Sequence, residues 1–175
     1  IATFGGLARF DGVRFKVFTT ANTPQLKNNR IITLATDHDQ NLWIGTERGE
    51  VLVYRDGVFR MIDDGKKYEY KIANDIFVDD KGIVWVSGWN GGRICHLQTG
   101  CSPVEFSAKI VLKVRQDSAG QHWGIADYQL QQLTDGKFVP DESFKKRVVN
   151  IEPNSNGGLW VVSVGELGTY HNGKY

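Results

Sequence analysis

Short apolar blocks alternate with polar ones along the whole chain. The clearest series covers residues 31–35, 42–46, 51–54 and 58–62, and these blocks are rich in β-branched and aromatic side chains. Blocks of this length and composition, bounded by Gly, Asp and Asn, are typical of β-strands. No long segment repeats its apolar residues with a helical period, and residues 141–147 would form one helical turn at most. The pattern therefore predicts an all-β protein.

A tryptophan marks each copy of this series, and the copies follow one another along the chain. Residues of the same type recur nine, six and three positions before the tryptophan, and a turn dipeptide follows about 14 positions after it. The tryptophans are Trp43, Trp85, Trp123 and Trp160, spaced 42, 38 and 37 residues apart. The preceding positions hold Leu34, Ile76, Val114 and Ile151, then Asp37, Asp79, Asp117 and Asn154, then Gln40, Gly82, Gly120 and Gly157. The dipeptides are Asp56-Gly57, Thr99-Gly100, Asp135-Gly136 and Asn172-Gly173. Self-similarity at a period of about 40 residues indicates a repeat architecture.

Each recurring position has a structural interpretation. The aliphatic residue lies in a first strand, and the Asp-x-x-Gly segment after it is a tight turn. In that turn the Asp side chain can accept hydrogen bonds from backbone amides ahead of it, while Gly tolerates positive φ. The tryptophan lies in a second strand, and the Asp-Gly dipeptide joins a third strand to a fourth. Four short antiparallel strands per copy predict the blade of a β-propeller, with the tryptophans buried between blades. A β-sandwich, the alternative, leaves the recurring tryptophan unexplained.

The copies add up to about four and a half blades. A partial blade covers residues 1–18, and further blades cover residues 28–62, 72–106, 109–139 and 147–175. Closed propellers typically have 4–8 blades. We therefore expect either an incomplete ring with open edges or contact between the half-blades at the two ends. Open edges would favour self-association, and the patterned start at Ile1 suggests a piece of a longer protein.

Charge excludes two classes of partner. The chain has 21 Lys and Arg against 20 Asp and Glu, a net charge of +1. Such a balance gives no basic surface for nucleic acid or for an anionic membrane. No apolar run is long enough to span a bilayer.

Residues 41–46 (Asn-Leu-Trp-Ile-Gly-Thr) and 6–12 (Gly-Leu-Ala-Arg-Phe-Asp-Gly), with the Asp-x-x-Gly turn before the tryptophan, resemble the two-component regulator propeller repeat. The resemblance covers nearly the whole chain and is weakest in the copy around Trp123. It implies a periplasmic sensor propeller from a membrane-anchored bacterial signalling protein, such as a hybrid two-component or diguanylate cyclase protein. A non-catalytic role in ligand sensing follows from the resemblance. The alternatives are a propeller enzyme resembling streptogramin lyase and a purely structural or protein-docking propeller.

The irregular loops are the expected ligand site. In a four-strand meander the turns after strands one and three lie on one face, and the connections after strands two and four lie on the other. The second face collects the variable loops, including the long ones near residues 66–70 and 141–146, and such loops on a rigid scaffold commonly carry recognition. We expect Arg48, Trp89, Arg93 and Tyr128 to lie there, with the aromatic rings stacking on a carbohydrate or peptide and Arg93 holding an anion.

No enzyme or metal chemistry is expected. Asp37 begins a segment like a calcium loop, but the sixth and twelfth positions hold Leu42 and Arg48 instead of Gly and Glu. The four histidines lack metal-ligand spacing, and no nucleophile motif or phosphate loop is present. No cofactor is implied.

The two cysteines flank a predicted hairpin. If residues 97–99 form a three-residue loop, Cys95 and Cys101 face each other and can form a disulfide, which an oxidising periplasm would favour. A two-residue loop would shift the register and separate them.

Overall fold

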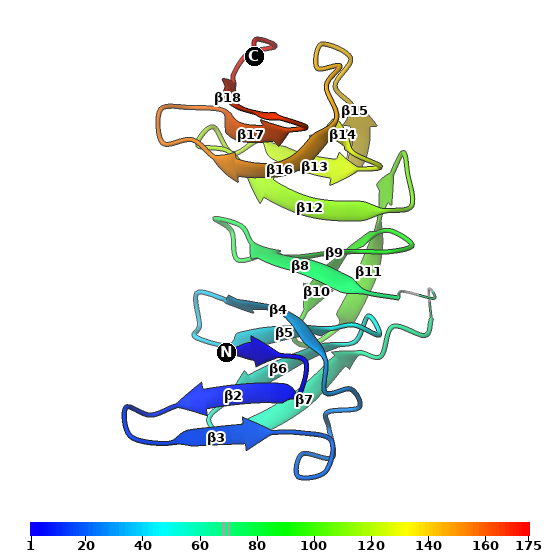
Figure 1. Cartoon of the computed structure of the whole chain (residues 1–175). Coiled ribbons are helices and arrows are strands. Elements are labelled where there is room, and N and C mark those ends of the chain that lie inside the picture. The colour runs from blue at the N-terminus through cyan, green and yellow to red at the C-terminus, as the bar shows by residue number, and fades with distance from the viewer. Residues whose placement is uncertain (68, 70) are drawn as a thin grey trace.

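The computed structural model describes residues 1–67, 69 and 71–175, and it is built of β-strands (Figure 1). The strands are β1 (Ala2–Thr3), β2 (Gly6–Phe10), β3 (Phe15–Phe18), β4 (Ile31–Thr36), β5 (Leu42–Thr46), β6 (Val51–Arg55), β7 (Val58–Asp63), β8 (Ala73–Val78), β9 (Val84–Gly88), β10 (Gly92–His96), β11 (Gly100–Phe106), β12 (Val111–Gln116), β13 (His122–Ala126), β14 (Gln129–Thr134), β15 (Lys137–Pro140), β16 (Val148–Pro153), β17 (Leu159–Ser163) and β18 (Glu166–Tyr170). Among these residues, no helix has the length and apolar character needed to cross a membrane.

The strands form successive antiparallel meanders, which we call blades 1 to 5: β1–β3, β4–β7, β8–β11, β12–β15 and β16–β18. Blades 3 and 4 are joined at their outer strands, because β11 and β15 pair in parallel. Phe106 and Phe138 stack at this junction with ring centroids 4.2 Å apart. The architecture confirms the prediction of an all-β propeller segment.

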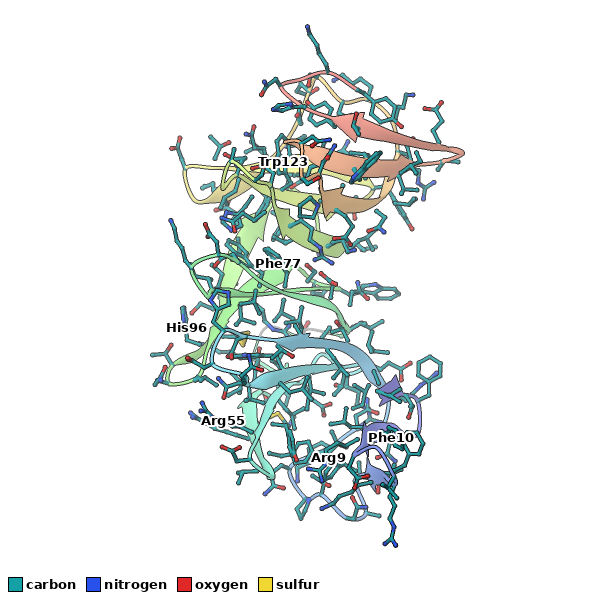
Figure 2. The ribbon with its side chains drawn as sticks, turned by 90° about the vertical axis from the view of Figure 1, so that its left-hand side faces the viewer. Arg9, Phe10, Arg55, Phe77, His96 and Trp123 are labelled. Carbon is teal, nitrogen blue, oxygen red and sulfur yellow. A yellow bond between two sulfur atoms is a disulfide. The ribbon has the colours of Figure 1, made fainter. Side chains whose placement is uncertain are left out.

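The blades follow one another in a single stack (Figure 1). Blade 1 and blade 5 lie at opposite ends of the stack in both views (Figures 1 and 2). The half-blades at the two ends of the chain therefore do not meet, and the arc stays open.

The Asp-x-x-Gly turns have the predicted geometry. In blade 2, the Asp37 carboxylate accepts hydrogen bonds from the amides of Asp39 and Asn41, at 3.0 and 2.9 Å. Gln40, at the position that holds Gly in the other copies, has φ of 65°. The turn also has a feature that we did not predict: the indole Nε1 of Trp43 donates to Asp37 at 2.8 Å.

The same indole bond recurs in blades 3 and 4. Trp85 donates to Asp79 at 3.0 Å and Trp123 donates to Asp117 at 2.8 Å. Asn154 stands at this position in blade 5, and its side-chain oxygen accepts from the amide of Asn156. The Asp carboxylate therefore links the turn to the indole ring. This hydrogen bond holds the ring in the orientation in which it packs on the next blade.

The first three tryptophans are buried between blades, as predicted. Trp43, Trp85 and Trp123 have relative exposures of 1%, 4% and 8%. Each packs against apolar residues of the following blade, such as Ile76 for Trp43. Figure 2 shows Trp123 within the stack. The prediction for Trp160 was wrong, because that side chain is 45% exposed. It lies on the side of blade 5 that faces away from blade 4, where no other described blade packs against it.

The cysteine hairpin has the three-residue loop that allows a disulfide. His96 pairs with Gly100 across the loop, and Cys95 lies directly opposite Cys101. The two residues are disulfide-bonded. The bond joins the third and fourth strands of blade 3, and Cys95 belongs to the core between blades 2 and 3.

A charged network joins the inner strands of blades 3, 4 and 5. Arg115 on β12 contacts Asp75 on β8 at 2.6 Å and Glu152 on β16 at 2.9 Å. Lys113 also reaches Glu152, at 2.5 Å. Burial alone would raise the pKa of Glu152, but the hydrogen bonds and charges of Arg115 and Lys113 outweigh it and lower that pKa. The network therefore stays ionised and fixes the relative orientation of three blades.

Candidate ligand-binding face

The turns between the second and third strands lie together with the connections that lead into each next blade. We call this side the loop face, defined by residues 47–50, 89–91, 127–128 and 164–165 and by the connections 107–110 and 141–147. Backbone hydrogen bonds tie each turn to the connection beside it. Glu47 N donates to Arg30 O at 3.0 Å, and Val164 N donates to Arg147 O at 3.2 Å. The scaffold thus holds these loops in fixed positions.

Trp89 follows β9 in the Gly-rich loop of blade 3. Asn90 and Gly91 have φ of 69° and 117°, so the chain reverses in the left-handed region directly after the tryptophan. The backbone of Trp89 forms an antiparallel bridge with Ile110, in the connection between blades 3 and 4. The indole is 45% exposed and Ile110 is 37% exposed. An apolar surface therefore begins at Trp89 and continues to the next blade.

Tyr128 lies in the two-residue turn between β13 and β14. Asp127 and Tyr128 have φ of 46° and 64°, which corresponds to the type of turn that usually holds Asn or Gly. An aromatic residue held in the left-handed region costs about 1–3 kcal/mol, and such strain is concentrated at functional sites. The turn is fixed on both sides, because Asp127 N donates to Ile110 O at 2.9 Å and Val148 N donates to Tyr128 O at 2.7 Å. Ile110 thus connects Tyr128 to Trp89 across two blades.

Arg147 covers one side of the Tyr128 ring. Its guanidinium carbon lies 3.8 Å from the ring centroid, within the range of a cation–π contact. Within residues 1–67, 69 and 71–175, its side chain has no hydrogen-bond or ion-pair partner. Five N–H donors are therefore available beside an exposed aromatic ring.

A cleft of about 320 Å³ opens next to Tyr128 and Arg147, between blade 4 and the connection that leads into blade 5. Its charged lining comes from the connection between those blades, where Glu142, Lys145 and Lys146 are exposed. Lys145 pairs with Glu142, and Lys146 pairs with Glu166. The cleft combines one aromatic ring with several exposed charges, a composition that suits a polar ligand.

Of the other two predicted site residues, one lies on this face and one does not. Arg48 is exposed in the equivalent turn of blade 2. Arg93 is 1% exposed and lies inside the protein, where its Nε is 3.1 Å from a carboxylate oxygen of Asp63 and its guanidinium donates to the carbonyl of Gly49. The guanidinium of Arg93 is bound by these two partners and is shielded from solvent. The prediction that Arg93 holds a ligand anion on the loop face was therefore wrong. The predicted loop at residues 66–70 includes positions 68 and 70, which are outside the described residues.

A second cleft, of about 460 Å³, lies between blades 4 and 5, where turns of the face opposite the loop face meet Asp141 and Ser143 of the connection 141–147. Tyr170 lines it and donates to Asp141, and its hydroxyl also contacts Ser143. Burial and the Asp141 carboxylate raise the pKa of Tyr170, so the phenol remains protonated. The sequence did not predict this cleft, because Asp141 and Tyr170 lie 29 positions apart in different blades.

His122 packs between two blades. Nε2 of His122 lies 3.0 Å from the Asp79 carboxylate, and its ring packs against Trp85 with centroids 4.8 Å apart. Burial raises the pKa of Asp79, but hydrogen bonds from Trp85, from the Ile83 amide and from His122 outweigh it and lower that pKa. In the described part of the chain, no group of three or more His, Cys, Asp or Glu is arranged to hold a metal ion.

Comparison with known families identifies the repeat. Residues 25–48, which contain β4, the Asp-x-x-Gly turn and β5, match the family model described as two component regulator propeller. The chain contains a two-component regulator propeller repeat. No curated protein is significantly similar in sequence to the chain.

Solved structures share the fold of this chain. The extracellular domains of two hybrid two component systems from B. thetaiotaomicron match with TM-scores of 0.72 and identities of 18% and 16%, over 89% and 95% of this chain. The chain spans about a quarter of those domains, 24% and 25%. Catalytically inactive virginiamycin B lyase from Staphylococcus aureus with quinupristin matches with a TM-score of 0.72 and 12% identity, over 98% of this chain and 61% of the lyase. At these identities the likeness concerns the fold.

Proposed function

We propose that the chain is a ligand-sensing segment from the extracytoplasmic region of a bacterial signalling protein, and that it binds a carbohydrate or peptide without catalysis. The family match at residues 25–48 and the fold shared with extracellular sensor domains support the sensor role. The ligand would occupy the loop face across blades 3 and 4, with the cleft beside Tyr128 taking its polar groups.

One observation carries this proposal: Tyr128 is exposed, is held in a left-handed turn and stacks on Arg147, whose side chain has no other partner among the described residues. A flat apolar ring next to guanidinium donors is suited to a ligand that has both C–H faces and polar groups, as sugars and peptides do. Trp89 provides a second ring, fixed to Tyr128 through the backbone of Ile110. Arg48, exposed on the same face, would contact only a ligand long enough to reach blade 2.

Thermal-shift screening against a panel of oligosaccharides and short peptides tests the proposal. A ligand that binds the folded chain raises its melting temperature in proportion to RT ln(1 + [L]/Kd). Tyr128→Ala and Trp89→Ala should each weaken binding of a hit by about 30-fold, as expected for a central aromatic contact worth about 2 kcal/mol. Val139→Ala, at an exposed apolar position on β15, is the matched control and should leave the affinity unchanged.

Two results would contradict the assignment. Equal affinity in wild type and both aromatic variants would move the ligand away from the loop face. Chemical conversion of a bound ligand would favour the lyase-like alternative, which the shared fold of virginiamycin B lyase raises.

A further inference from the structure

The cleft beside Tyr128 has as many basic side chains as acidic ones in its lining. The charged residues of this lining are Asp127, Asp141, Glu142, Lys145, Lys146 and Arg147. The total charge of the cleft therefore does not indicate the charge of a ligand. The contacts that each charged group makes within the protein decide what the cleft can bind.

Both lysines of the cleft are already paired with carboxylates. Lys145 donates to Glu142, and Lys146 donates to Glu166. In each pair the two opposite charges largely cancel for a third group in solvent. Neither lysine is therefore a strong site for an incoming anion.

Arg147 differs from the lysines. Its side chain is exposed, and in the described part of the chain its guanidinium has no ion-pair or hydrogen-bond partner. The guanidinium carbon lies 3.8 Å from the centroid of the Tyr128 ring, so the ring covers one face of the guanidinium. The N–H groups point outward in the plane of the guanidinium, and stacking leaves them available. One positive charge of the cleft thus remains without a partner.

The backbone on both sides of this pair is fixed. Arg147 O accepts from Val164 N at 3.2 Å, and Tyr128 O accepts from Val148 N at 2.7 Å. The stacked ring limits the rotation of the guanidinium. A site that is already ordered loses less conformational entropy when a ligand binds.

A carboxylate is the group that this arginine is best suited to bind. The planar guanidinium can donate two parallel hydrogen bonds to the two oxygens of a carboxylate. We infer that the ligand of the loop face is an acidic oligosaccharide built from uronic acids, and that Arg147 binds one of its carboxylates. This inference rests on the proposed function, because it assigns the class of ligand for the same site.

Two further observations favour a sugar over a peptide. The Asp127 carboxylate lines the cleft and accepts from the amide of Ile110 at 3.3 Å, and it can accept further hydrogen bonds from hydroxyl groups. A uronic acid has both a carboxylate for Arg147 and hydroxyls for Asp127. The backbone groups Asp127 N and Tyr128 O are already bonded within the chain. They offer no free strand edge on which a peptide main chain could pair.

Isothermal titration calorimetry with matched pairs of sugars tests the inference. The probes are trimers of galacturonic, glucuronic and mannuronic acid, each compared with its carboxyl-reduced counterpart. Linkage and length are the same within a pair, so the difference in Kd isolates the carboxylate. At least one acidic trimer should bind the wild-type chain about 10-fold more tightly than its neutral counterpart, as expected for a charge-assisted hydrogen bond. The preference should shrink as the salt concentration rises, because salt screens exposed charges.

Variants of Arg147 connect this preference to one side chain. In Arg147→Gln the affinity for the acidic trimer should fall to that of the neutral trimer, while the affinity for the neutral trimer changes little. Arg147→Lys should recover only part of the preference, because an ammonium group lacks the planar pair of donors. Arg60→Gln, at an exposed position on β7 of blade 2, makes the same change in net charge and should leave the preference unchanged.

Several results would overturn the inference. Equal affinity for both members of every pair would do so, and so would an equal loss for both members in Arg147→Gln. Tighter binding of a sulfated trimer or of a glutamate tripeptide, lost in Arg147→Gln, would assign the anion to another kind of ligand. Binding of neutral sugars alone, weakened by Tyr128→Ala, would overturn the inference and leave the proposed function intact. If no sugar or peptide binds, both fail.

Discussion

Replacing Trp123 or Trp160 by alanine compares the same repeat position with and without a covering blade. Trp123 is 8% exposed, its ring contacts Tyr170 edge to face with centroids 5.7 Å apart, and its indole donates to Asp117. Truncating a buried tryptophan removes its transfer free energy and leaves a cavity, so Trp123→Ala should cost about 3–5 kcal/mol. Trp160 is nearly half exposed, and Trp160→Ala should cost about 1 kcal/mol.

Urea unfolding followed by far-UV circular dichroism measures both values, since removing one of the five tryptophans would itself change the fluorescence signal. The urea midpoint should fall while the m-value stays unchanged, which identifies a change in stability. For a chain of this length, a loss of 3–5 kcal/mol corresponds to a fall in melting temperature of about 6–20 °C. The protein is kept at low micromolar concentration so that self-association does not contribute. Equal losses in the two variants would refute the argument that the following blade buries the tryptophan.

Three further outcomes follow from the buried polar and covalent contacts. The pKa of Asp79 is lowered below 3.8 in the folded state, so the contribution of its carboxylate to stability is present above about pH 4 and is lost as the pH falls through the folded pKa. Measuring the free energy of unfolding as a function of acid pH should show this loss. In Asp79→Asn the free energy of unfolding should depend less on pH over the same range. Reducing the bond between Cys95 and Cys101 should lower stability by about 2 kcal/mol for so short a loop, and thiol titration of the denatured protein should find no free thiol before reduction. Arg93→Met should cost about 3–5 kcal/mol, because it leaves the Asp63 carboxylate without this buried partner, and should leave ligand affinity unchanged; a stable variant with weakened binding would contradict the buried role.

The sequence predicted the features that recur in every copy of the repeat. The tryptophan spacing located the interfaces between blades. For the cysteine hairpin the sequence left two loop lengths open, and the structure has the three-residue loop, which places Cys95 opposite Cys101. The indole bond could also have been found, because Asp precedes Trp by six positions in three copies. The exposure of Trp160 could not be read from its own strand, since burial at that position comes from the following blade.

The residues of the candidate site were harder to predict, because contacts between blades decide which of them are exposed. Trp89 and Tyr128 were recognisable as aromatic residues outside the repeated positions, and both lie on the loop face. Arg93 stood in an equally Gly-rich segment, but its partner Asp63 lies 30 positions earlier, in blade 2. Ion pairs between blades depend on the angle at which two sheets meet. That angle cannot be predicted from the sequence of a single blade.

The parallel pairing of β11 and β15 affects the order in which the blades unfold locally. In a linear array of repeats, stability is close to a sum of terms for each repeat and for each contact between neighbours. Blades 3 and 4 share hydrogen bonds at their outer edge in addition to packed side chains. The contact between these two blades therefore contributes more free energy than side-chain packing alone would. Opening that begins at either end of the stack would stop at this pair. Blades 3 and 4 would then form the last cooperative unit to exchange its amide hydrogens with solvent. They are the two blades that carry Trp89 and Tyr128, so the ligand platform would stay assembled while the ends of the stack fray.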